Sequence, residues 1–261
     1  MDRGWTRLRQ RLGVAMGLLA ALAAPASAGL CDRIDHDGQG YVLCTLEAEA
    51  EPDLRLWLDD AAGQVYGDFS RVKSALPRGE ALLFAMNAGM FHADYQPVGL
   101  FVADGRRVGA VQTAASKGNF GMLPNGVFCT GGRRPFAVIE SRAFAADPPD
   151  CRLATQSGPM LVIDGQLHPR FLVDATSRYI RNGVGVSADG KTAWFAISDR
   201  PVTFHEFGRL FRDGLGARDA LYFDGSVSRL YAPEAGRADW GRRLGPIIGL
   251  VAPARDQARV D

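Results

Sequence analysis

Asp-Gly pairs between short apolar runs are the feature that most limits the folds open to this chain. Three such pairs each separate two runs with strand character: Asp104-Gly105, Asp164-Gly165 and Asp189-Gly190. Asp-Gly is typical of the two-residue turn of a β-hairpin, because both central residues of that turn need a positive φ. The chain is therefore predicted to contain many antiparallel strands joined by tight turns.

Predicted strands clearly outnumber predicted helices along the chain. The strands span residues 41–46, 54–58, 81–86, 98–111 (as a hairpin), 120–123, 127–129, 136–139, 160–163, 184–186, 193–197, 220–223 and 247–251. Short helices are predicted at residues 69–76, near 142–146, and after Thr203, where Thr203 and Glu206 form a capping box. This pattern favours an α+β class: a single domain with a large, mostly antiparallel β-sheet and a few packed helices.

The first 28 residues have the pattern of a secretory signal peptide rather than of a folded segment. Four arginines precede an uncharged run over residues 12–24, and Ala26-Ser27-Ala28 is a typical cleavage site. The apolar run is too short for a membrane anchor. We therefore predict cleavage after Ala28, a domain over residues 29–261 with its core at about 82–251, and a periplasmic or secreted protein without a stable membrane span.

The net charge and the cysteine count of the mature chain indicate what it binds and how it is cross-linked. The leader holds four of the 30 basic residues and one of the 29 acidic ones, so the mature chain carries a net charge of −2. That balance argues against a nucleic-acid binder, which would show a basic stripe. Four cysteines in an exported chain indicate two disulfides, and sequential pairing, Cys31 with Cys44 and Cys129 with Cys151, is the favoured one of three connectivities.

Several catalytic templates are absent from the sequence. There is no G-x-S-x-G nucleophile elbow, no P-loop, and no G-x-G-x-x-G that opens a helix. His205-Glu206 begins like a metalloprotease helix, but Arg209 stands where the second histidine would be. With four widely spaced histidines, no metal site and no cofactor are predicted.

Polar residues at the ends of apolar runs are the remaining candidates for chemistry. They comprise two carboxylates, a guanidinium, an imidazole and several neutral or backbone groups: Asp199, Asp224, Arg181, His92, Asn87, Gly89, Ser157, Gly158 and Ser226. A sheet that gathers these ends at one edge suits hydrolysis of a sugar linkage that bears an anionic group. Simpler interpretations stay open: Asp224-Gly225 as only a turn, Asp199 as a residue that orders a loop, Arg181 as a surface ion pair, and His92 as part of a polar surface loop.

Four segments resemble sequence blocks of the phosphodiester glycosidases, in the same order along the chain. They are Asn87-Ala88-Gly89-Met90-Phe91, Ser157-Gly158-Pro159-Met160-Leu161, Arg181-Asn182-Gly183-Val184-Gly185 and Phe223-Asp224-Gly225-Ser226. The longer runs MFHADYQPVGLFV and RNGVGVSADGK are similar to an uncharacterised, exported bacterial branch of that family. Two positions depart from its pattern: Ala88 replaces a glycine, and Gly225-Ser226-Val227 replaces a triple glycine.

The resemblance implies hydrolysis of a sugar-1-phosphodiester, at the glycosidic C1–O bond next to phosphate, in an envelope or extracellular glycan. Asp224 would then be the nucleophile or general base, and Asp199 a second carboxylate or an orienting residue. Arg181 would hold the phosphate, with His92 as a weaker candidate. The other candidate residues would bind the substrate, a carbohydrate or phosphoglycan.

Two other functions stay open at this point. The altered glycine loop after Asp224 would suit a glycan- or envelope-binding protein of the same fold without turnover. An ordinary O-glycoside hydrolase would need its two carboxylates at a separation that the sequence does not give.

Overall fold

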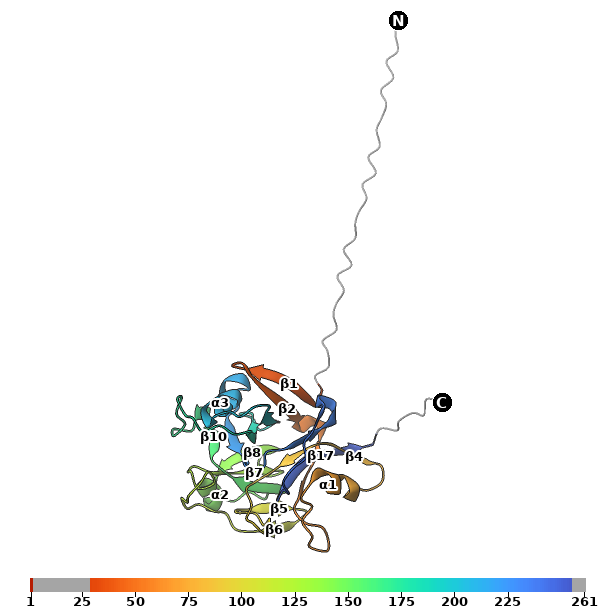
Figure 1. The fold of residues 1–261 in the computed structure, drawn as a ribbon, viewed down its shortest axis with the longest axis vertical. Helices are drawn as coiled ribbons and strands as arrows, with labels where there is room; N and C mark the ends of the chain where they lie inside the picture. Colours follow the sequence, from red (N-terminus) through yellow and green to blue (C-terminus); the bar gives the residue numbers. More distant parts are fainter. Residues whose placement is uncertain (2–28, 255–261) are drawn as a thin grey trace.

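The computed structural model describes Met1 and residues 29–254. The predicted signal peptide, apart from Met1, and its cleavage site lie outside the described residues. Within the described residues the strands pair antiparallel throughout and form three sheets. The predicted α+β single domain, rich in antiparallel strands, is therefore confirmed, with its strands shared among three sheets (Figure 1).

The spatial order of the strands differs from their order in the sequence in all three sheets. From edge to edge, the seven-stranded sheet contains β1 (Cys31–His36), β2 (Gln39–Glu47), β13 (Thr192–Ser198), β12 (Asn182–Val186), β14 (Asp219–Tyr222), β10 (Met160–Ile163) and β11 (Gln166–Leu167). The second sheet contains β16 (Arg237–Ala238), β15 (Leu230–Ala232), β4 (Glu80–Asn87), β17 (Ile247–Pro253) and β3 (Asp53–Trp57). The third contains β6 (Arg106–Val108), β5 (Phe101–Ala103), β9 (Leu153–Ser157), β7 (Gly126–Thr130) and β8 (Phe136–Glu140).

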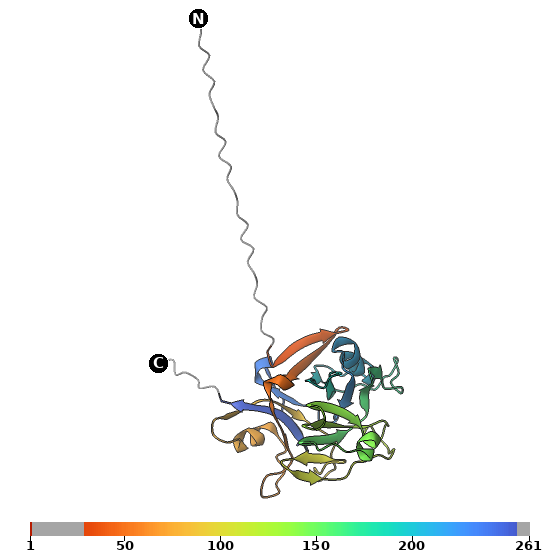
Figure 2. The ribbon, with the colours of Figure 1, turned by 180° about the vertical axis from the view of Figure 1, so that it is seen from behind.

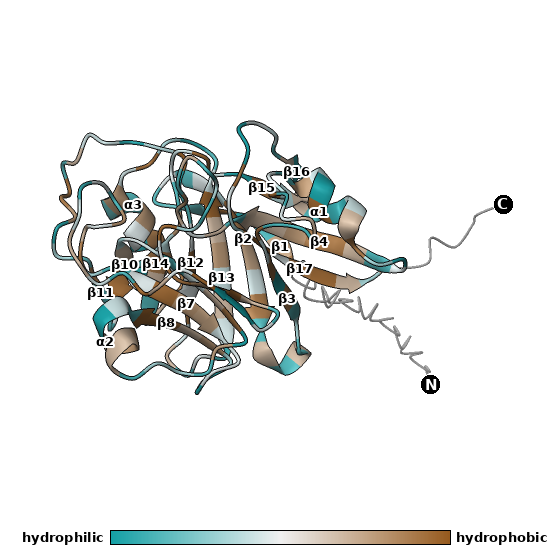
Figure 3. Ribbon diagram, turned by 90° about the horizontal axis from the view of Figure 1, so that it is seen from below, coloured by the Kyte–Doolittle hydropathy of each residue, from teal (hydrophilic) through white to brown (hydrophobic). Residues whose placement is uncertain are grey.

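One apolar core joins the three sheets. Phe195 of β13 packs against Phe84 of β4, with ring centroids 5.3 Å apart, and against Phe128 of β7 at 5.6 Å. All three rings are completely buried. Because each ring comes from a different sheet, this contact fixes the sheets relative to one another. Hydrophobic residues concentrate on the strands and hydrophilic ones on the connecting loops (Figure 3).

Each sheet has a helix against its other face, and the three helices lie on different sides of the strands (Figures 1 and 2). They are α1 (Phe69–Ala75) on the second sheet, α2 (Ser141–Ala146) on the third, and α3 (Phe204–Arg209) on the seven-stranded sheet. A π-helical turn (Leu210–Gly214) continues α3, and short 3-10 turns occupy Ala48–Ala50 and Pro233–Ala235. The predicted capping box is present, since the Glu206 N–H donates to Thr203 Oγ1 at 3.1 Å and the Thr203 N–H to Glu206 Oε2 at 2.8 Å.

The Asp-Gly pairs differ in the backbone conformation of their two residues. Both residues have a positive φ at Asp104-Gly105 and Asp164-Gly165, as expected for hairpin turns, and also at Asp37-Gly38, a hairpin absent from the predicted elements. At Asp189-Gly190 only the glycine does. Neither Asp224 nor Gly225 has a positive φ. There the chain leaves β14 of the seven-stranded sheet and enters β15 of the second sheet, so this pair connects sheets rather than closing a hairpin.

One predicted strand is wrong, and five strands were not predicted. Residues 120–123 form turns and bends because the Asn125 side-chain amide donates to Phe120 O at 3.0 Å and the Met122 N–H to Asn119 O at 3.1 Å. The unpredicted strands are β1, β9, β11, β15 and β16.

The two predicted disulfides, Cys31–Cys44 and Cys129–Cys151, are both present. The first joins β1 to β2, and the second ties β7 to the segment after α2. Within residues 29–254, no helix has the length and apolar character that crossing a membrane requires.

Candidate functional site

Polar side chains from all three sheets meet where the ends of four strands converge. Asn87 is the last residue of β4, Asn182 the first of β12 and Ser157 the last of β9, while Asp224 follows β14 by two positions. The first three side chains are at most 1% exposed. Buried polar groups persist only when hydrogen bonds replace their lost hydration, so their partners define the site.

A reciprocal pair of amides joins the seven-stranded sheet to the second sheet. Asn87 Nδ2 donates to Asn182 Oδ1 at 3.1 Å, and Asn182 Nδ2 donates to the backbone oxygen of Asn87 at 2.8 Å. Each asparagine thereby keeps one carbonyl oxygen directed at the loop that carries Asp224. The pair holds two strand ends together and presents acceptors to a third segment.

The loop over residues 224–229 is fixed by those two acceptors. Asn182 Oδ1 accepts from the Asp224 N–H at 3.4 Å and from Ser228 Oγ at 3.1 Å. Asn87 Oδ1 accepts from the Arg229 N–H at 2.9 Å. Ser228 Oγ also donates to the backbone oxygen of Asp224, which closes the loop on itself. The backbone N–H of Asp224 is therefore held by the buried Asn182, and its backbone oxygen by the half-buried Ser228.

The third sheet contributes Ser157, whose hydroxyl donates to Phe223 O at 2.6 Å. Next to it, Gly89 packs so closely on β9 that a Cβ at this position would collide with Gln156 O, and its N–H donates to Thr155 Oγ1 at 3.1 Å. At Gly158 a Cβ would lie 2.6 Å from the Cβ of Asn125. These glycines allow the backbones to approach one another beneath the Asp224 loop.

The Asp224 carboxyl itself is half-buried. Burial raises its pKa above the ordinary value, while hydrogen bonds from the Ser226 and Gly225 N–H groups and the positive charge of Arg242 act in the opposite direction. The Ser226 N–H lies 2.7 Å from Asp224 Oδ1. A carboxylate that is partly desolvated, oriented by backbone donors and reachable by solvent can act as a nucleophile or general base.

Arg181 is completely buried beside this cluster. Its guanidinium stacks on Phe204, with its central carbon 3.6 Å from the ring centroid, and donates to Val202 O at 2.9 Å and Ser177 O at 3.1 Å. No carboxylate within residues 29–254 pairs with it, Nη1 has no hydrogen-bond partner there, and burial lowers its pKa. The guanidinium also lies near the ring of Tyr222, at 5.4 Å.

Comparison with known proteins agrees with this architecture. A family model described as phosphodiester glycosidase matches residues 80–250. The chain belongs to the phosphodiester glycosidase family. A protein of Escherichia coli (strain K12), described as uncharacterized protein YigE, is 29% identical over 202 residues, which are 77% of this chain and 77% of that protein. Membership of a glycosidase family indicates a carbohydrate substrate.

A solved structure shows the same fold at low sequence identity. It is the zebrafish N-acetylglucosamine-1-phosphodiester alpha-N-acetylglucosaminidase catalytic domain, auto-inhibited by its pro-peptide. The match has a TM-score of 0.57 and 12% identity, and covers 86% of this chain and 84% of that chain. The phosphodiester glycosidase fold is thus found independently by sequence and by structure.

Three predicted site residues of this family member are exposed. Ser226 contributes its N–H to Asp224, and the backbone of His92 forms a turn in which its N–H donates to Gln96 O at 2.8 Å. Asp199 pairs with Arg33 at 3.3 Å and Arg237 at 3.1 Å. Among the described residues, no direct hydrogen bond or ion pair joins Asp199 to the Asp224 cluster. Its role as second carboxylate stays a prediction.

Three residues of the cluster were not among the predicted site residues: Asn182, Ser228 and Arg242. Asn182 and Ser228 adjoin predicted residues in the sequence, and their polar character next to glycine and apolar residues was the available signal. Arg242 lies in a run, Gly241-Arg242-Arg243, without strand or helix periodicity. Its approach to Asp224 depends entirely on the folded path of the chain.

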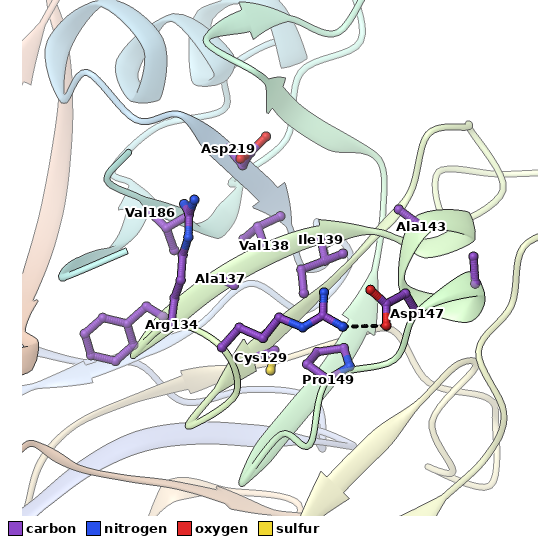
Figure 4. Close-up of a pocket in the computed structure, with 13 residues that line it drawn as sticks. Cys129, Arg134, Ala137, Val138, Ile139, Ala143, Asp147, Pro149, Val186 and Asp219 are labelled. Carbon is purple, nitrogen blue, oxygen red and sulfur yellow. Dashed lines mark ion pairs between the residues drawn. The ribbon is translucent and has the colours of Figure 1, made fainter. Parts of the chain in front are cut away.

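A pocket of about 580 Å³ lies elsewhere on the phosphodiester glycosidase domain (Figure 4). Asp219 lines it with residues of β8 and α2, and an ion pair between Arg133 and Asp147 lies at its side. Asp219 begins β14 and Asp224 follows its end, which separates them by about 16 Å along an extended chain. This pocket is therefore not part of the Asp224 cluster. Within the described residues, no group of three or more His, Cys, Asp and Glu side chains is arranged to hold a metal ion.

Proposed function

We propose that this protein is an exported hydrolase that cleaves the glycosidic C1–O bond of a sugar-1-phosphodiester in an envelope or extracellular glycan. The observation that carries the proposal is the half-buried Asp224 carboxyl, on a loop whose backbone N–H groups at Asp224 and Arg229 are held by amides from two sheets, within a phosphodiester glycosidase fold. A simple surface turn would not need such support from buried side chains, one of them 42 positions from Asp224 and the other 142 positions from Arg229 in the sequence.

The proposed reaction is a substitution at C1 of the sugar. Asp224 either attacks C1 to form a glycosyl ester that water then hydrolyses, or takes a proton from the water that attacks C1 directly. The C1–O bond breaks, and its electron pair leaves with the phosphate monoester. Since that leaving group is weakly basic, stabilising the oxocarbenium-like transition state and holding the phosphate contribute more than protonating the leaving oxygen.

The phosphate needs a cation that solvent can reach. Arg181, predicted for this role, is 0% exposed, and its Nε and Nη2 donate to backbone oxygens. We therefore assign it to positioning β12 and Tyr222 behind the Asp224 loop. Arg242 is exposed and its charge acts on Asp224, so we assign the phosphate contact to Arg242.

Export is supported by the two disulfides, which persist in oxidising compartments outside the cytosol. Secretion to the periplasm or beyond would place the enzyme beside envelope and extracellular glycans. The predicted cleavage after Ala28 is checked by N-terminal sequencing of the protein recovered from the periplasm or medium.

The activity is tested on a panel of sugar-1-phosphodiesters, with aryl glycosides that lack phosphate as the matched comparison. Hydrolysis of the phosphodiesters, with release of the free sugar and a phosphate monoester, is the expected result. Hydrolysis of the aryl glycosides at equal rates would point to an ordinary O-glycoside hydrolase. Glycan binding without turnover of either set would contradict the proposal.

Arg242 should also shift the pH dependence of the reaction. Because Asp224 acts in its ionised form, kcat/KM rises with pH through the Asp224 pKa, which lies above the ordinary aspartate value of about 3.9. Arg242→Ala removes a charge that lowers this pKa, so the acidic limb should move to higher pH. Arg242→Lys should hold it near the wild-type position.

Arg243→Ala is the matched control, since it removes the same charge one residue further on. Arg243 donates to Val65 O at 2.9 Å and stacks on Tyr95 rather than acting on Asp224. The pH–rate profiles of the three variants and wild type give the answer. An acidic limb that stays in place in Arg242→Ala would exclude the assigned contact.

A further inference from the structure

Four large hydrophobic side chains are exposed among residues 29–254, and all four lie on segments that flank the Asp224 loop. They are Leu172, Val173, Tyr179 and Trp240, exposed by 63%, 80%, 51% and 92%. The first three belong to the loop between β11 and β12, and a Cβ at Gly225 would lie 3.4 Å from the Cβ of Tyr179. Trp240 precedes Arg242, whose charge acts on Asp224, by two positions. The exposed apolar side chains are therefore gathered around the candidate site.

The loop between β11 and β12 carries the Leu172-Val173 tip and is fixed at both ends. At its start, Phe171 stacks on Phe204 of α3, with ring centroids 5.0 Å apart. At its end, the backbones of Tyr179 and Val202 exchange two hydrogen bonds, of 3.2 and 2.8 Å. The loop projects from the domain beside α3 and β10 (Figure 1). Because both ends are fixed, the fold itself presents the tip to solvent.

The tip is a turn in which the Ala175 N–H donates to Leu172 O at 3.3 Å. Turns usually carry glycine, proline or small polar residues, whereas Leu172 and Val173 occupy this one. Neither side chain packs against an apolar cluster of the described core, so neither contributes to the stability of the domain. Adjacent exposed apolar side chains beside a functional site indicate a surface that another apolar phase covers.

Exposed arginines surround these apolar side chains. On the segments 168–179, 199–203, 224–229 and 239–243, four exposed arginines form no ion pair within the described residues: Arg170, Arg200, Arg242 and Arg243. Asp174 and Asp224 are the acidic residues of these segments that likewise form none. The positive charges therefore exceed the negative ones. This excess is complementary to a surface of anionic lipid head groups.

The shape of the surface favours a lipid membrane over a protein partner. A stable protein interface buries about 800 Å² per partner in a continuous patch. Here the apolar groups stand apart: the Leu172-Val173 tip lies on the α3 side of the Asp224 loop, and Trp240 lies on the side of the second sheet, near Phe69 and Tyr231. Aliphatic side chains can enter the acyl region of a membrane, while tyrosine and tryptophan favour the head-group layer.

We propose that the Leu172-Val173 tip, Tyr179 and Trp240 form a docking surface for a membrane of anionic phospholipids, with the Asp224 loop turned toward the lipid head groups. The protein binds peripherally, because the tip enters a single leaflet. Docking requires no turnover, so the inference goes beyond the proposed function. It brings the candidate site to glycans that are carried on the membrane.

Co-sedimentation of the exported protein with lipid vesicles tests the docking surface. Wild type should sediment with phosphatidylglycerol vesicles more than with phosphatidylcholine vesicles, and added NaCl should weaken this binding. Leu172→Ser/Val173→Ser should raise the lipid concentration for half-maximal binding about tenfold, since it removes both aliphatic groups. Ala61→Ser/Ala62→Ser, the same kind of exchange in the exposed turn after β3, is the matched control and should bind like wild type.

Tryptophan fluorescence shows which face of the protein meets the lipid. Phosphatidylglycerol vesicles should shift the emission of wild type to shorter wavelengths. The shift should vanish in Trp240→Phe and persist in Trp57→Phe, because Trp57 packs against the apolar cluster under α1. Sedimentation without a shift that depends on Trp240 would place another face on the membrane and contradict the proposal.

Three further outcomes would overturn the docking surface. Wild type could fail to sediment with vesicles, or the tip exchange could leave the binding unchanged. Self-association of wild type that the tip exchange abolishes, without vesicle binding, would assign the surface to a second copy of the chain. Hydrolysis of soluble sugar-1-phosphodiesters by a protein that does not bind vesicles would contradict only the docking surface, whereas vesicle binding without turnover would contradict only the proposed reaction.

Discussion

Replacing Asp224 by Asn should lower kcat/KM on a sugar-1-phosphodiester about a thousandfold, the scale of a positioned acid–base or nucleophilic group. Asparagine keeps the oxygen that accepts from the Ser226 N–H, so the loop geometry should persist. It removes the negative charge that attacks C1 or activates water. Initial rates at the pH optimum, with purified variant and wild type side by side, measure the effect.

Asp224→Asn should lower activity without lowering the stability of the folded protein. The folded-state pKa of Asp224 is raised, so ionising the carboxyl in the folded protein is unfavourable relative to the unfolded chain. The penalty is absent below the unfolded value of about 3.9 and develops as the pH rises through the folded pKa. Asp224→Asn should therefore unfold at the same or a higher urea concentration than wild type at pH 7, with the difference fading toward pH 4.

Asp104→Asn is the matched control for the same chemical change. Asp104 lies in a hairpin turn with a positive φ, where asparagine is equally well accommodated, so neither activity nor stability should change appreciably. Near wild-type activity of Asp224→Asn would remove Asp224 from the mechanism. Loss of activity accompanied by lower stability at pH 7 would instead assign Asp224 a structural role.

The Asp-Gly pairs show which backbone conformations in this protein can be predicted from the local sequence and which cannot. Asp-Gly predicts a hairpin at residues 104–105 and 164–165 because the backbone requirement is local and both residues meet it. The same dipeptide at residues 224–225 has a different conformation, because Asp224 and the loop after it are held by side chains from other strands. Local preference gives way where long-range hydrogen bonds determine the backbone.

The two neighbours Arg181 and Asn182 show why the site could be predicted only in part. Successive side chains in a strand point to opposite faces. Asn182 faces Asn87 and the Asp224 loop, while Arg181 faces Phe204 under α3. The sequence indicates that the two residues diverge, but not which face holds the site. Which face holds the site depends on how the three sheets pack against one another. Neither the local hydrophobic pattern nor the composition of the chain determines that packing.

Replacing Asn182 by Ala should strongly lower the free energy of unfolding. Its Oδ1 accepts from Asn87 Nδ2, the Asp224 N–H and Ser228 Oγ, so Asn182→Ala removes the shared acceptor of three groups, of which Asn87 is buried. Stranding buried donors costs about 1–3 kcal/mol each, and relaxation of the exposed side of the loop will recover some of it. We expect the free energy of unfolding to fall by about 3 kcal/mol, measured by urea denaturation.

Asn182→Asp separates the two functions of this amide. It keeps the acceptor but replaces Nδ2, which donates to Asn87 O at 2.8 Å, with an oxygen that repels it. It should therefore also be destabilised, whereas Asn119→Ala, at an asparagine whose side chain makes no hydrogen bond to the cluster within the described residues, should unfold like wild type. In Asn182→Ala molecules that remain folded, the released Asp224 loop should lower kcat while inhibition by free inorganic phosphate at Arg242 persists. If Asn182→Ala matched Asn119→Ala in both stability and kcat, the amide pair would not be what holds Asp224 in place.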